Sequence, residues 1–574
     1  MPTHKGGLVT RKTLAGRLLA LLVALMLIAA ACGSDSDSGD ESSSDTTSGS
    51  SSDDTAAPET QAGGEFIDLG TFVGDPPEHI DPALNVTLDA YQVINALYDG
   101  LTDIDTTDPA NPVVVPDVAE SYEVNDDATV WTFTIRDDQV FSTGEQVLPS
   151  SFKASWERAA TMAGDYSYLM NFIDGGIDVV NGDAEEISGV VADDEAMTLE
   201  VTMSEPYANF DAVAGFQLFF PMPTEALEAD DFTEWENGVM IGNGPYKMAE
   251  PRTDEQIVIE KNDEWDGNFN GDTFPDRLDT ITFVTTADPD TAYNSFEAGE
   301  GNDANIPPAR TAEAQENYGT TLDVPILGSY HFDFNLEDPT VGGDDNLLFR
   351  QAVSQAIDRD EINEAVYSGS RTISTGITPE GIPGFRADLC DYCSYDPEAA
   401  QAAFDEWTAA GNEQSEPMPI QFNRDAGHEP VVQIMVDNLA AIGIEAVADP
   451  IDSETYFSQL AEGACVFCRS GWFADYPTYD NFMYDLFHSD SLGGNNYGFD
   501  NEEFDSVVDE AKATTDKDAQ AELFQQAEQI LLNDQVAAVP INWYRGDYAY
   551  GNDVAVFPQT NFGLILWEQV AFAA

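Results

Sequence analysis

The stretch from Met418 to Asp449, "MPIQFNRDAGHEPVVQIMVDNLAAIGIEAVAD", decides the fold class of this chain. Its middle has the pattern of an amphipathic helix ending before a glycine, with an apolar face made of Val432, Met435, Leu439 and Ile442. Short apolar segments near 418–422 and 444–448 predict a strand on either side of this helix. A strand, a helix and a strand in this order form a βαβ unit, whose two strands are parallel. The sequence therefore predicts an α/β fold with mixed sheets.

Both kinds of element recur along the chain. Asp396 and Pro397 supply an N-cap and a first turn for a helix that reaches about Ala410, with Gly411 after its end. Alternating apolar and polar residues predict strands in "TVWTFTIRDDQVF" (129–141), "TLEVTM" (198–203), "QIVIEKN" (256–262) and "DTITFVTT" (279–286). The turn residues at 125–127 predict a hairpin into the first of these strands.

The charge of the chain is extreme. Its 574 residues include 21 Lys and Arg against 107 Asp and Glu, a formal net charge of −86. Such a chain repels phosphate backbones, so nucleic-acid binding is excluded as a function class. The simplest interpretation is a solvated acidic surface. An excess of carboxylates with few lysines fits a protein that works in high salt, where screening relieves self-repulsion.

The N-terminal 63 residues read as an export and anchoring segment. A basic stretch precedes fourteen largely apolar residues, Leu18 to Ala31, which are too few to span a bilayer and fit a signal peptide at 1–32. The sequence "LIAAAC" resembles a bacterial lipobox, which predicts lipidation of Cys32; the alternative is an ordinary signal peptide with a chance cysteine. Residues 33–63 are rich in Ser and Asp, which predicts a disordered acidic tether holding a folded body near a membrane.

Four further cysteines form two CxxC motifs, "CDYC" (Cys390, Cys393) and "CVFC" (Cys465, Cys468). Export favours disulfides over a zinc site, which stays the second interpretation, and a redox-active motif is the third. "GACVFCRSGW" looks like a strand, in which residues i and i+3 lie about 10 Å apart, too far for a bridge. We therefore expect two disulfides that join the two motifs, and no bound metal or other cofactor.

Seven segments occur in an order that resembles the family 5 extracytoplasmic solute-binding proteins of ABC importers. They are "HIDPALNVTLDAYQVINALYDGLTDID" (79–105), "VAESYEVNDDATVWTFTIRDDQVFSTGEQV" (118–147), "GNGPYKM" (242–248), "FNLEDPTVGGDDNLLFRQAVSQAIDRDEI" (334–362), "YDPEAAQAAFDE" (395–406), "GWFADYPTYDNF" (471–482) and "AVPINWYR" (538–545). Within the fourth segment, Arg350 and Arg359 are expected at the surface or in ion pairs.

The resemblance implies a fold like that of the type II periplasmic binding proteins, with two lobes that close at a hinge and an extra inserted domain. Domain I would be assembled from residues 64–108, 232–325 and 545–574. Domain II would be the insertion at 109–231, and domain III, the ligand-binding lobe, residues 326–544. The implied function is capture of a peptide or related solute and its delivery to ABC permease subunits in the membrane, by a monomer, with no bond made or broken.

The resemblance also implies a ligand site. In peptide-binding members an aspartate of the "GW-x-x-D" turn meets the α-amino group of the ligand, and Asp475 is the matching residue. Arg424 lies near the position of an arginine that binds the ligand carboxylate in dipeptide-binding members, and Trp472 and Tyr476 flank the turn as pocket wall or core. The alternative for Asp475 is an internal salt bridge with an arginine or lysine.

Two other function classes remain open from the sequence. An exported hydrolase is disfavoured because the chain has no GxSxG or HExxH motif and its five histidines are scattered. A sensory or adhesive lipoprotein with the same fold is not distinguished from a transport protein. The ligand also stays open, since family members bind peptides, nickel complexes, oligosaccharides and other solutes.

The charge imbalance leads to the first prediction. Because 107 acidic residues face only 21 basic ones, self-repulsion destabilises the compact state in dilute buffer. We expect the melting temperature to rise substantially between low and molar sodium chloride, measured by calorimetry or circular dichroism. A melting temperature that does not depend on salt would contradict the high-salt interpretation.

Overall fold

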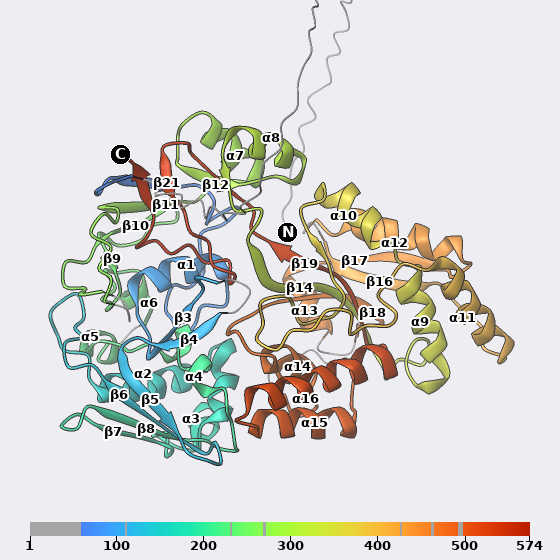
Figure 1. Ribbon diagram of the computed structural model, residues 1–574, viewed down its shortest axis with the longest axis horizontal. Helices are drawn as coiled ribbons and strands as arrows, with labels where there is room; N and C mark the ends of the chain where they lie inside the picture. Colours follow the sequence, from blue (N-terminus) through green and yellow to red (C-terminus); the bar gives the residue numbers. More distant parts are fainter. Residues whose placement is uncertain are drawn as a thin grey trace, which may run out of the picture. The chain divides into compact units, whose positions relative to one another are not determined.

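The structure, a computed structural model, describes residues 59–574 except 109–111, 230–231, 268–270, 425–426, 461–463 and 492–496. Its largest sheet has six strands in the order β15 (Thr372–Ile373), β19 (Ala538–Arg545), β14 (Pro325–Phe334), β18 (Phe467–Phe473), β16 (Met418–Asn423) and β17 (Ala446–Ile451) (Figure 1). β16 and β17 pair in parallel and are joined by α12 (Glu429–Ala441), so the predicted βαβ unit is confirmed. β14, β18 and β19 pair antiparallel, which makes the sheet mixed as expected.

Helices from residues 347–529 belong to the same region. They are α9 (Leu347–Ala356), α10 (Arg359–Tyr367), α11 (Pro397–Ala409), α13 (Tyr456–Gln459), α14 (Asp480–Phe487), α15 (Glu502–Ala513) and α16 (Lys517–Gln529). α11 begins as predicted, because the Asp396 carboxylate accepts a hydrogen bond from the backbone N–H of Ala399 at 2.9 Å. It ends before Gly411, whose φ of 97° is disfavoured for any residue with a Cβ.

A second region combines segments from both ends of the chain. One sheet has the order β2 (Glu65–Asp68), β11 (Thr280–Val284), β10 (Gln256–Lys261) and β9 (Tyr246–Met248). Two three-stranded sheets are β12 (Asp303–Asn305), β20 (Tyr548–Tyr550), β13 (Gly319–Thr320) and β1 (Thr60–Gln61), β22 (Ala571–Ala573), β21 (Val554–Val556). The helices of this region are α1 (Leu88–Leu97), α6 (Phe232–Glu236), α7 (Pro289–Glu297) and α8 (Thr311–Asn317).

The third region is continuous in sequence. Its sheet has the order β5 (Ala119–Val124), β6 (Val130–Ile135), β8 (Thr198–Thr202) and β7 (Val190–Asp193), and β3 (Thr102–Asp105) pairs with β4 (Val113–Pro116) beside it. Its helices are α2 (Pro149–Met162), α3 (Gly176–Val180), α4 (Phe210–Val213) and α5 (Thr224–Leu227). β5 and β6 form the predicted hairpin, in which the Asn125 backbone N–H donates to Val130 O at 3.0 Å.

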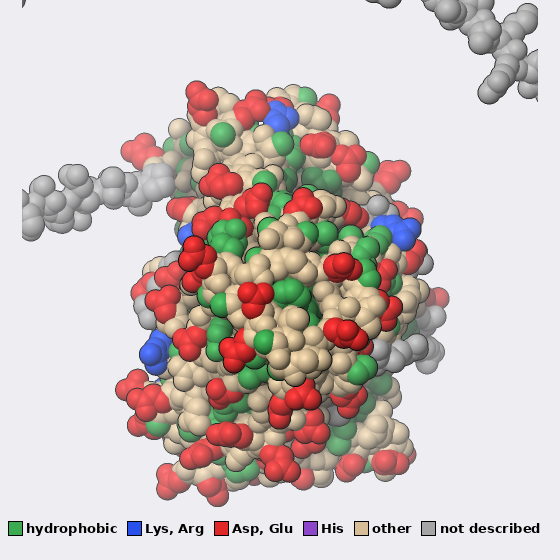
Figure 2. Space-filling model, turned by 90° about the vertical axis from the view of Figure 1, so that its right-hand side faces the viewer, with side chains coloured by type: hydrophobic (Ala, Val, Ile, Leu, Met, Phe, Trp, Pro, Cys, Tyr) green, Lys and Arg blue, Asp and Glu red, His purple; other side chains and the backbone are tan. Residues whose placement is uncertain are grey.

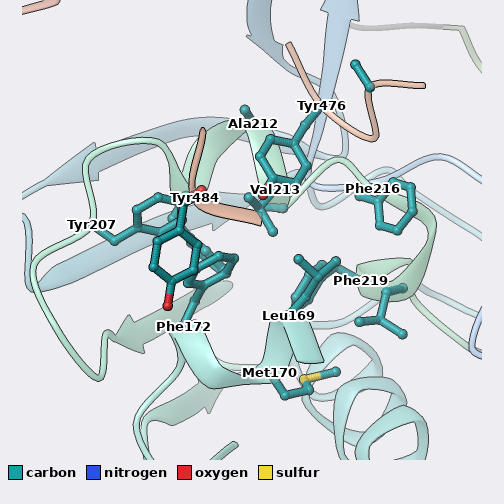
Figure 3. Packing of buried hydrophobic residues seen from close by; sticks show 14 of the residues in the cluster. Leu169, Met170, Phe172, Tyr207, Ala212, Val213, Phe216, Phe219, Tyr476 and Tyr484 are labelled. Carbon is teal, nitrogen blue, oxygen red and sulfur yellow. The ribbon is translucent and has the colours of Figure 1, made fainter. Parts of the chain in front are cut away.

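The third region shares one hydrophobic core with the C-terminal helices of the six-stranded sheet's region. Tyr476 and Tyr484 pack among Phe172, Tyr207 and their neighbours, as Figure 3 shows. Polar groups are paired across the same contact, since the Tyr207 hydroxyl and the Asn209 amide each donate to the buried Asp480 carboxylate at 2.6 Å. Apolar burial and satisfied hydrogen bonds together hold these two regions against each other.

Two adjacent chain segments connect the six-stranded sheet to the second region. Residues 321–324 lead from β13 into β14, and residues 546–547 lead from β19 into β20. The two segments are hydrogen bonded, because Gly546 N–H donates to Val324 O and Thr321 N–H to Tyr548 O, both at 3.0 Å. Any Cβ at Gly546 would lie 2.4 Å from Thr321 O, so only glycine allows this approach. A short double connection of this kind is where a hinge between two lobes would lie.

The predicted tether extends too far. Thr60 and Gln61 form β1, which pairs antiparallel with β22 near the C-terminus, and the Thr60 hydroxyl donates to Asp276 at 3.0 Å. The tether prediction for residues 59–63 is therefore wrong, because partners distant in sequence satisfy this backbone. The predicted signal peptide, Cys32 and the rest of the tether lie outside the described residues.

The predicted disulfide pairing is also wrong. The structure joins Cys390 to Cys393 and Cys465 to Cys468, with Cα–Cα distances of 5.5 and 5.6 Å. The prediction assumed that a strand runs through both members of the second motif. The chain instead bends at Val466, and β18 begins only at Phe467, so Cys465 lies outside the strand. The bend brings the two Cα atoms within the range that a disulfide spans.

Two arginines expected at the surface are buried. Arg350 and Arg359 are 1% and 3% exposed, and both donate to backbone carbonyls. Arg359 bonds Pro540 O at 2.6 Å, Ser354 O at 3.1 Å and Ile357 O at 3.2 Å, which ties the start of α10 to β19. Burial lowers the pKa of Arg350 to about 10 and that of Arg359 to about 9, because the loss of hydration disfavours the charged form.

Carboxylates, in contrast, are spread over the surface with few basic side chains among them (Figure 2).

We predict that Arg359→Met destabilises the protein by about 2–4 kcal/mol. Each buried carbonyl left without a donor costs about 1–3 kcal/mol, and relief of the buried charge offsets part of this. Urea unfolding measures the loss. Arg310→Met is the control, because Arg310 donates to Glu297 and Glu313 at the surface and its removal should change stability little. Equal effects of the two substitutions would contradict this account.

Candidate ligand-binding site

Asp475 lies where β18 runs into α14. The Ala474 backbone N–H donates to Leu327 O at 2.7 Å, which keeps the chain against β14 just beyond the last paired residue, Phe473. Pro477 then interrupts the extended chain, and α14 begins at Asp480. Asp475 therefore lies just beyond the C-terminal end of β18.

Asn481, on the first turn of α14, holds the Asp475 turn in place. Its Oδ1 accepts from the Trp472 indole at 2.9 Å and from the Asp475 backbone N–H at 3.0 Å. Its Nδ2 donates to the Asp475 carboxylate at 3.2 Å and to Asp485 at 2.9 Å. Asn481 is fully buried with all four of its hydrogen bonds made, so it fixes the orientation of the Asp475 carboxylate.

The Asp475 carboxylate is partly removed from water without a neutralising charge. The Tyr166 hydroxyl, from the third region, donates to its other oxygen at 3.0 Å. Burial raises the pKa of Asp475 to about 7, and the hydrogen bonds from Asn481 and Tyr166 only partly oppose this. No described basic side chain forms an ion pair with it, so the described residues do not support the internal salt bridge.

Asp475 lines a cavity of about 490 Å³ that draws on all three regions of the fold. The second region contributes Tyr91 and Asn95 of α1, Asp99, Trp265 and much of 558–569, and the third region contributes residues 102–107 of and after β3. Asp117, Ala212 and Gly215 come from the third region. Its lining therefore combines aromatic, amide and acidic side chains, which suits a polar organic ligand.

A smaller cavity of about 280 Å³ adjoins it and shares Gln559. It lies beside the double connection and is lined by Asp547, Tyr548, Arg371 and Arg545, among others. The Arg371 guanidinium carbon lies 5.4 Å from the Tyr367 ring and 5.1 Å from the Tyr544 ring, and its Nη1 donates to Arg545 O at 3.2 Å. Its Nε is buried without an acceptor among the described residues, so the Arg371 guanidinium has an N–H group that could donate to a ligand.

Of the four predicted ligand residues, only Asp475 lines either of these two cavities. Tyr476 is fully buried and donates to Asp485 at 2.5 Å, and Trp472 is engaged by Asn481, so both support the turn from behind. Arg424 follows β16, is exposed, and donates to Pro450 O at 3.0 Å, away from either cavity. The structure does not bring Arg424 and Asp475 to one cavity.

Sequence reasoning missed Asn481, Tyr166, Asp117 and Arg371. Asn481 stands in the segment that carried the resemblance, six residues after Asp475. Tyr166 is 309 residues from Asp475, and no local pattern marks it. Arg371 and Asp117 acquire their positions from the packing of separate regions, which a single sequence does not reveal.

The fold has close counterparts among solved structures. The Escherichia coli murein tripeptide binding protein MppA superposes with a TM-score of 0.73 at 22% identity, over 90% of this chain and 99% of that one. Haemophilus influenzae OppA, in complex with RPPGFSPFR, gives 0.70 at 24% identity, over 90% and 100%. This likeness defines the fold as the α/β type of the periplasmic peptide-binding proteins.

The sequence comparison names the family. A model of the bacterial extracellular solute-binding proteins, family 5 Middle, matches residues 113–494, and the chain belongs to this family. Its relatives are described as binding proteins. The Bacillus subtilis oligopeptide-binding protein OppA is 26% identical over 79% of this chain and 83% of its own, and the dipeptide-binding protein DppE of the same organism is 24% identical over 82% and 85%. Within the described residues, no helix is both long and apolar enough to cross a membrane.

We predict that Asp475→Asn stabilises the ligand-free protein more at pH 8.5 than at pH 5.5. A carboxyl with a raised pKa binds its proton more tightly when folded, so wild-type stability falls as the pH rises from the ordinary pKa of 3.8 to about 7, and at pH 5.5 only part of this loss has occurred. The amide avoids this loss, and we expect its melting temperature at pH 8.5 to exceed that of wild type by about 2 °C or more.

Asp126→Asn, in the exposed β5–β6 turn, is the matched control and should show no such pH-dependent difference. If Asp475→Asn shifts the melting temperature equally at both pH values, or lowers it more at pH 8.5, the carboxylate is not destabilised by burial.

Proposed function

We propose that this protein captures peptides, with Asp475 binding the ligand's α-ammonium group, and delivers them to an ABC permease. The observation that carries the proposal is the Asp475 carboxylate: it lines the cavity, is oriented by two neutral donors and has no basic partner among the described residues. A ligand ammonium would supply the missing charge. Because the cavity is partly dry, this pair would be stronger than one in water.

Arg371 is our candidate for the opposite end of the ligand. It takes the role that sequence reasoning gave to Arg424, since Arg371 lines the adjoining cavity and Arg424 does not. Asp475 and Arg371 belong to different cavities that share Gln559, so a ligand with separated positive and negative ends fits the pair. A peptide has such ends, and the printed names of the relatives refer to oligopeptides and dipeptides.

The remaining parts of the proposal concern movement and location. We propose that the regions described above are the three expected domains and that the lobes close about residues 321–324 and 546–547. Lipidation at Cys32 would anchor the protein to the outer face of the cytoplasmic membrane, where it works as a monomer. The relatives called periplasmic and the extracellular family support a location outside the cytoplasm.

The test is a pair of ligands crossed with a pair of proteins. Titration calorimetry compares trialanine and N-acetyl-trialanine, each binding to wild type and to Asp475→Ala, after native mass spectrometry has shown the proteins to be free of co-purified ligand. Loss of a buried ammonium–carboxylate pair costs about 2–5 kcal/mol, so trialanine should bind at least about thirtyfold more weakly to the variant. Acetylation should weaken the binding of trialanine to wild type by a similar factor. It should weaken binding to Asp475→Ala little further.

Asp126→Ala should bind both ligands as wild type does. If acetylated trialanine binds wild type as tightly as trialanine does, Asp475 does not contact the α-amino group. The same holds if the affinity lost on acetylation is as large in Asp475→Ala as in wild type. If no peptide binds at all, peptide capture itself is refuted.

A further inference from the structure

The large cavity contains a second group of carboxylates besides Asp475. Asp99, Asp103, Asp117 and Glu568 all line it. The described residues of the lining include no Lys, Arg or His. These four side chains come from the end of α1, from β3, from the link between β4 and β5 and from the C-terminal segment. The fold thus brings three acids from residues 99–117 together with one from the C-terminal segment.

Asp117 differs from the many acidic residues at the surface because it is buried. It is only 6% exposed, yet no described residue donates a hydrogen bond to its carboxylate. Its backbone N–H donates to Leu101 O at 3.1 Å, which fixes the residue against the start of β3. Burial raises the pKa of Asp117 well above its ordinary value, and the nearby charges of Asp99 and Asp103 raise it further. Buried carboxyl groups normally have a hydrogen-bond partner, so a ligand could supply the one that Asp117 lacks.

The other three carboxylates have few donors. Asp99 accepts from the Trp265 indole at 2.7 Å, and Glu568 accepts from the Gln569 amide at 3.3 Å. Burial raises the pKa of Asp99 to about 8, of Glu568 to about 7 and of Asp103 to about 6. Repulsion from Asp103 adds to the shift at both Asp99 and Glu568. Asp117 is buried, Asp99 and Glu568 are half-buried and Asp103 is exposed, so these acids repel one another in a space that water reaches only in part.

Basic side chains outside the lining oppose these pKa shifts only in part, and Arg277 does so at Glu568. Arg136 opposes the shifts at Asp99 and Asp117, but it already pairs with Asp138 at 3.2 Å and Asp266 at 3.4 Å. No set of three or more acidic, His or Cys side chains among the described residues converges as a metal site would. The cavity is large, and Tyr91, Phe274 and Phe562 also line it. Aromatic and acidic walls together suit an organic cation.

We propose that this cavity binds ammonium or guanidinium groups, and that the protein therefore selects peptides with Lys or Arg side chains over neutral peptides of the same length. The inference rests on the proposed peptide-binding function. It adds a second cation subsite, built on Asp99 and Asp117, to the one at Asp475. The same chemistry would also accept a free linear polyamine.

The test compares trilysine, triglutamine and a linear triamine by titration calorimetry in 1 M sodium chloride, where long-range attraction to the acidic surface is screened. We expect trilysine to bind wild type at least tenfold more tightly than triglutamine. In Asp99→Asn/Asp117→Asn this ratio should fall toward one. Asp126→Asn/Asp137→Asn removes two exposed carboxylates and should keep the wild-type ratio.

Thermal melts check that each variant is folded. If Asp99→Asn/Asp117→Asn does not fold, Asp99→Asn, which keeps an acceptor for Trp265, is tested alone and should reduce the ratio. An equal affinity of wild type for trilysine and triglutamine overturns the cation subsite and leaves peptide capture standing. A preference that persists in the folded variant also overturns it. If the triamine binds, loses affinity in the variant, and neither peptide binds, the subsite stands and peptide capture fails.

Discussion

The pairing of β14 with its two antiparallel neighbours is the interaction on which the rest of the structure depends. Its bonds to β18 continue until Phe473, and the Ala474 N–H then donates to Leu327 O, so the register of this pair sets where Asp475 emerges. On its other side, β14 pairs with β19, and the two strands leave the sheet together as the double connection to the second region. A one-residue slip would turn every side chain of the strand to the other face. One ladder thus positions the proposed ligand contact and the proposed hinge.

Buried charged groups have different surroundings in the framework of the fold and in the cavity. In the framework, Arg350 and Arg359 are surrounded by carbonyl oxygens, and the acid Asp480 receives two short hydrogen bonds. These groups are satisfied within the protein and hold elements together. In the cavity, Asp475 and Asp117 are short of positive charge or of donors. A protein gains nothing in stability from such groups, and this difference supports the proposal that a ligand completes the interactions in the cavity.

The acidic composition has two separable consequences. Many carboxylates are exposed, as on the face that Figure 2 shows, where they influence solubility and salt dependence but mark no site. Composition alone would therefore have made any cluster of acids in this chain unconvincing. What distinguishes the buried Asp117 and the half-buried Asp99 is their position in a common cavity with aromatic and amide side chains around them. Only the coordinates separate these few acids from the many that water covers.

The sequence by itself determined the α/β class, the βαβ unit at 418–451, the β5–β6 hairpin and the cap of α11, because periodicity, turn residues and capping residues act within a few positions. The family resemblance also indicated Asp475, which lines the larger cavity. The tertiary structure alone decided the local disulfides, the buried arginines, the pairing of Thr60 with Ala573 and the position of Arg371, unlike Arg424, in the lining of a cavity. These depend on a bend of one residue or on contacts across hundreds of residues. No local propensity encodes such contacts, since they are set by which surfaces pack together.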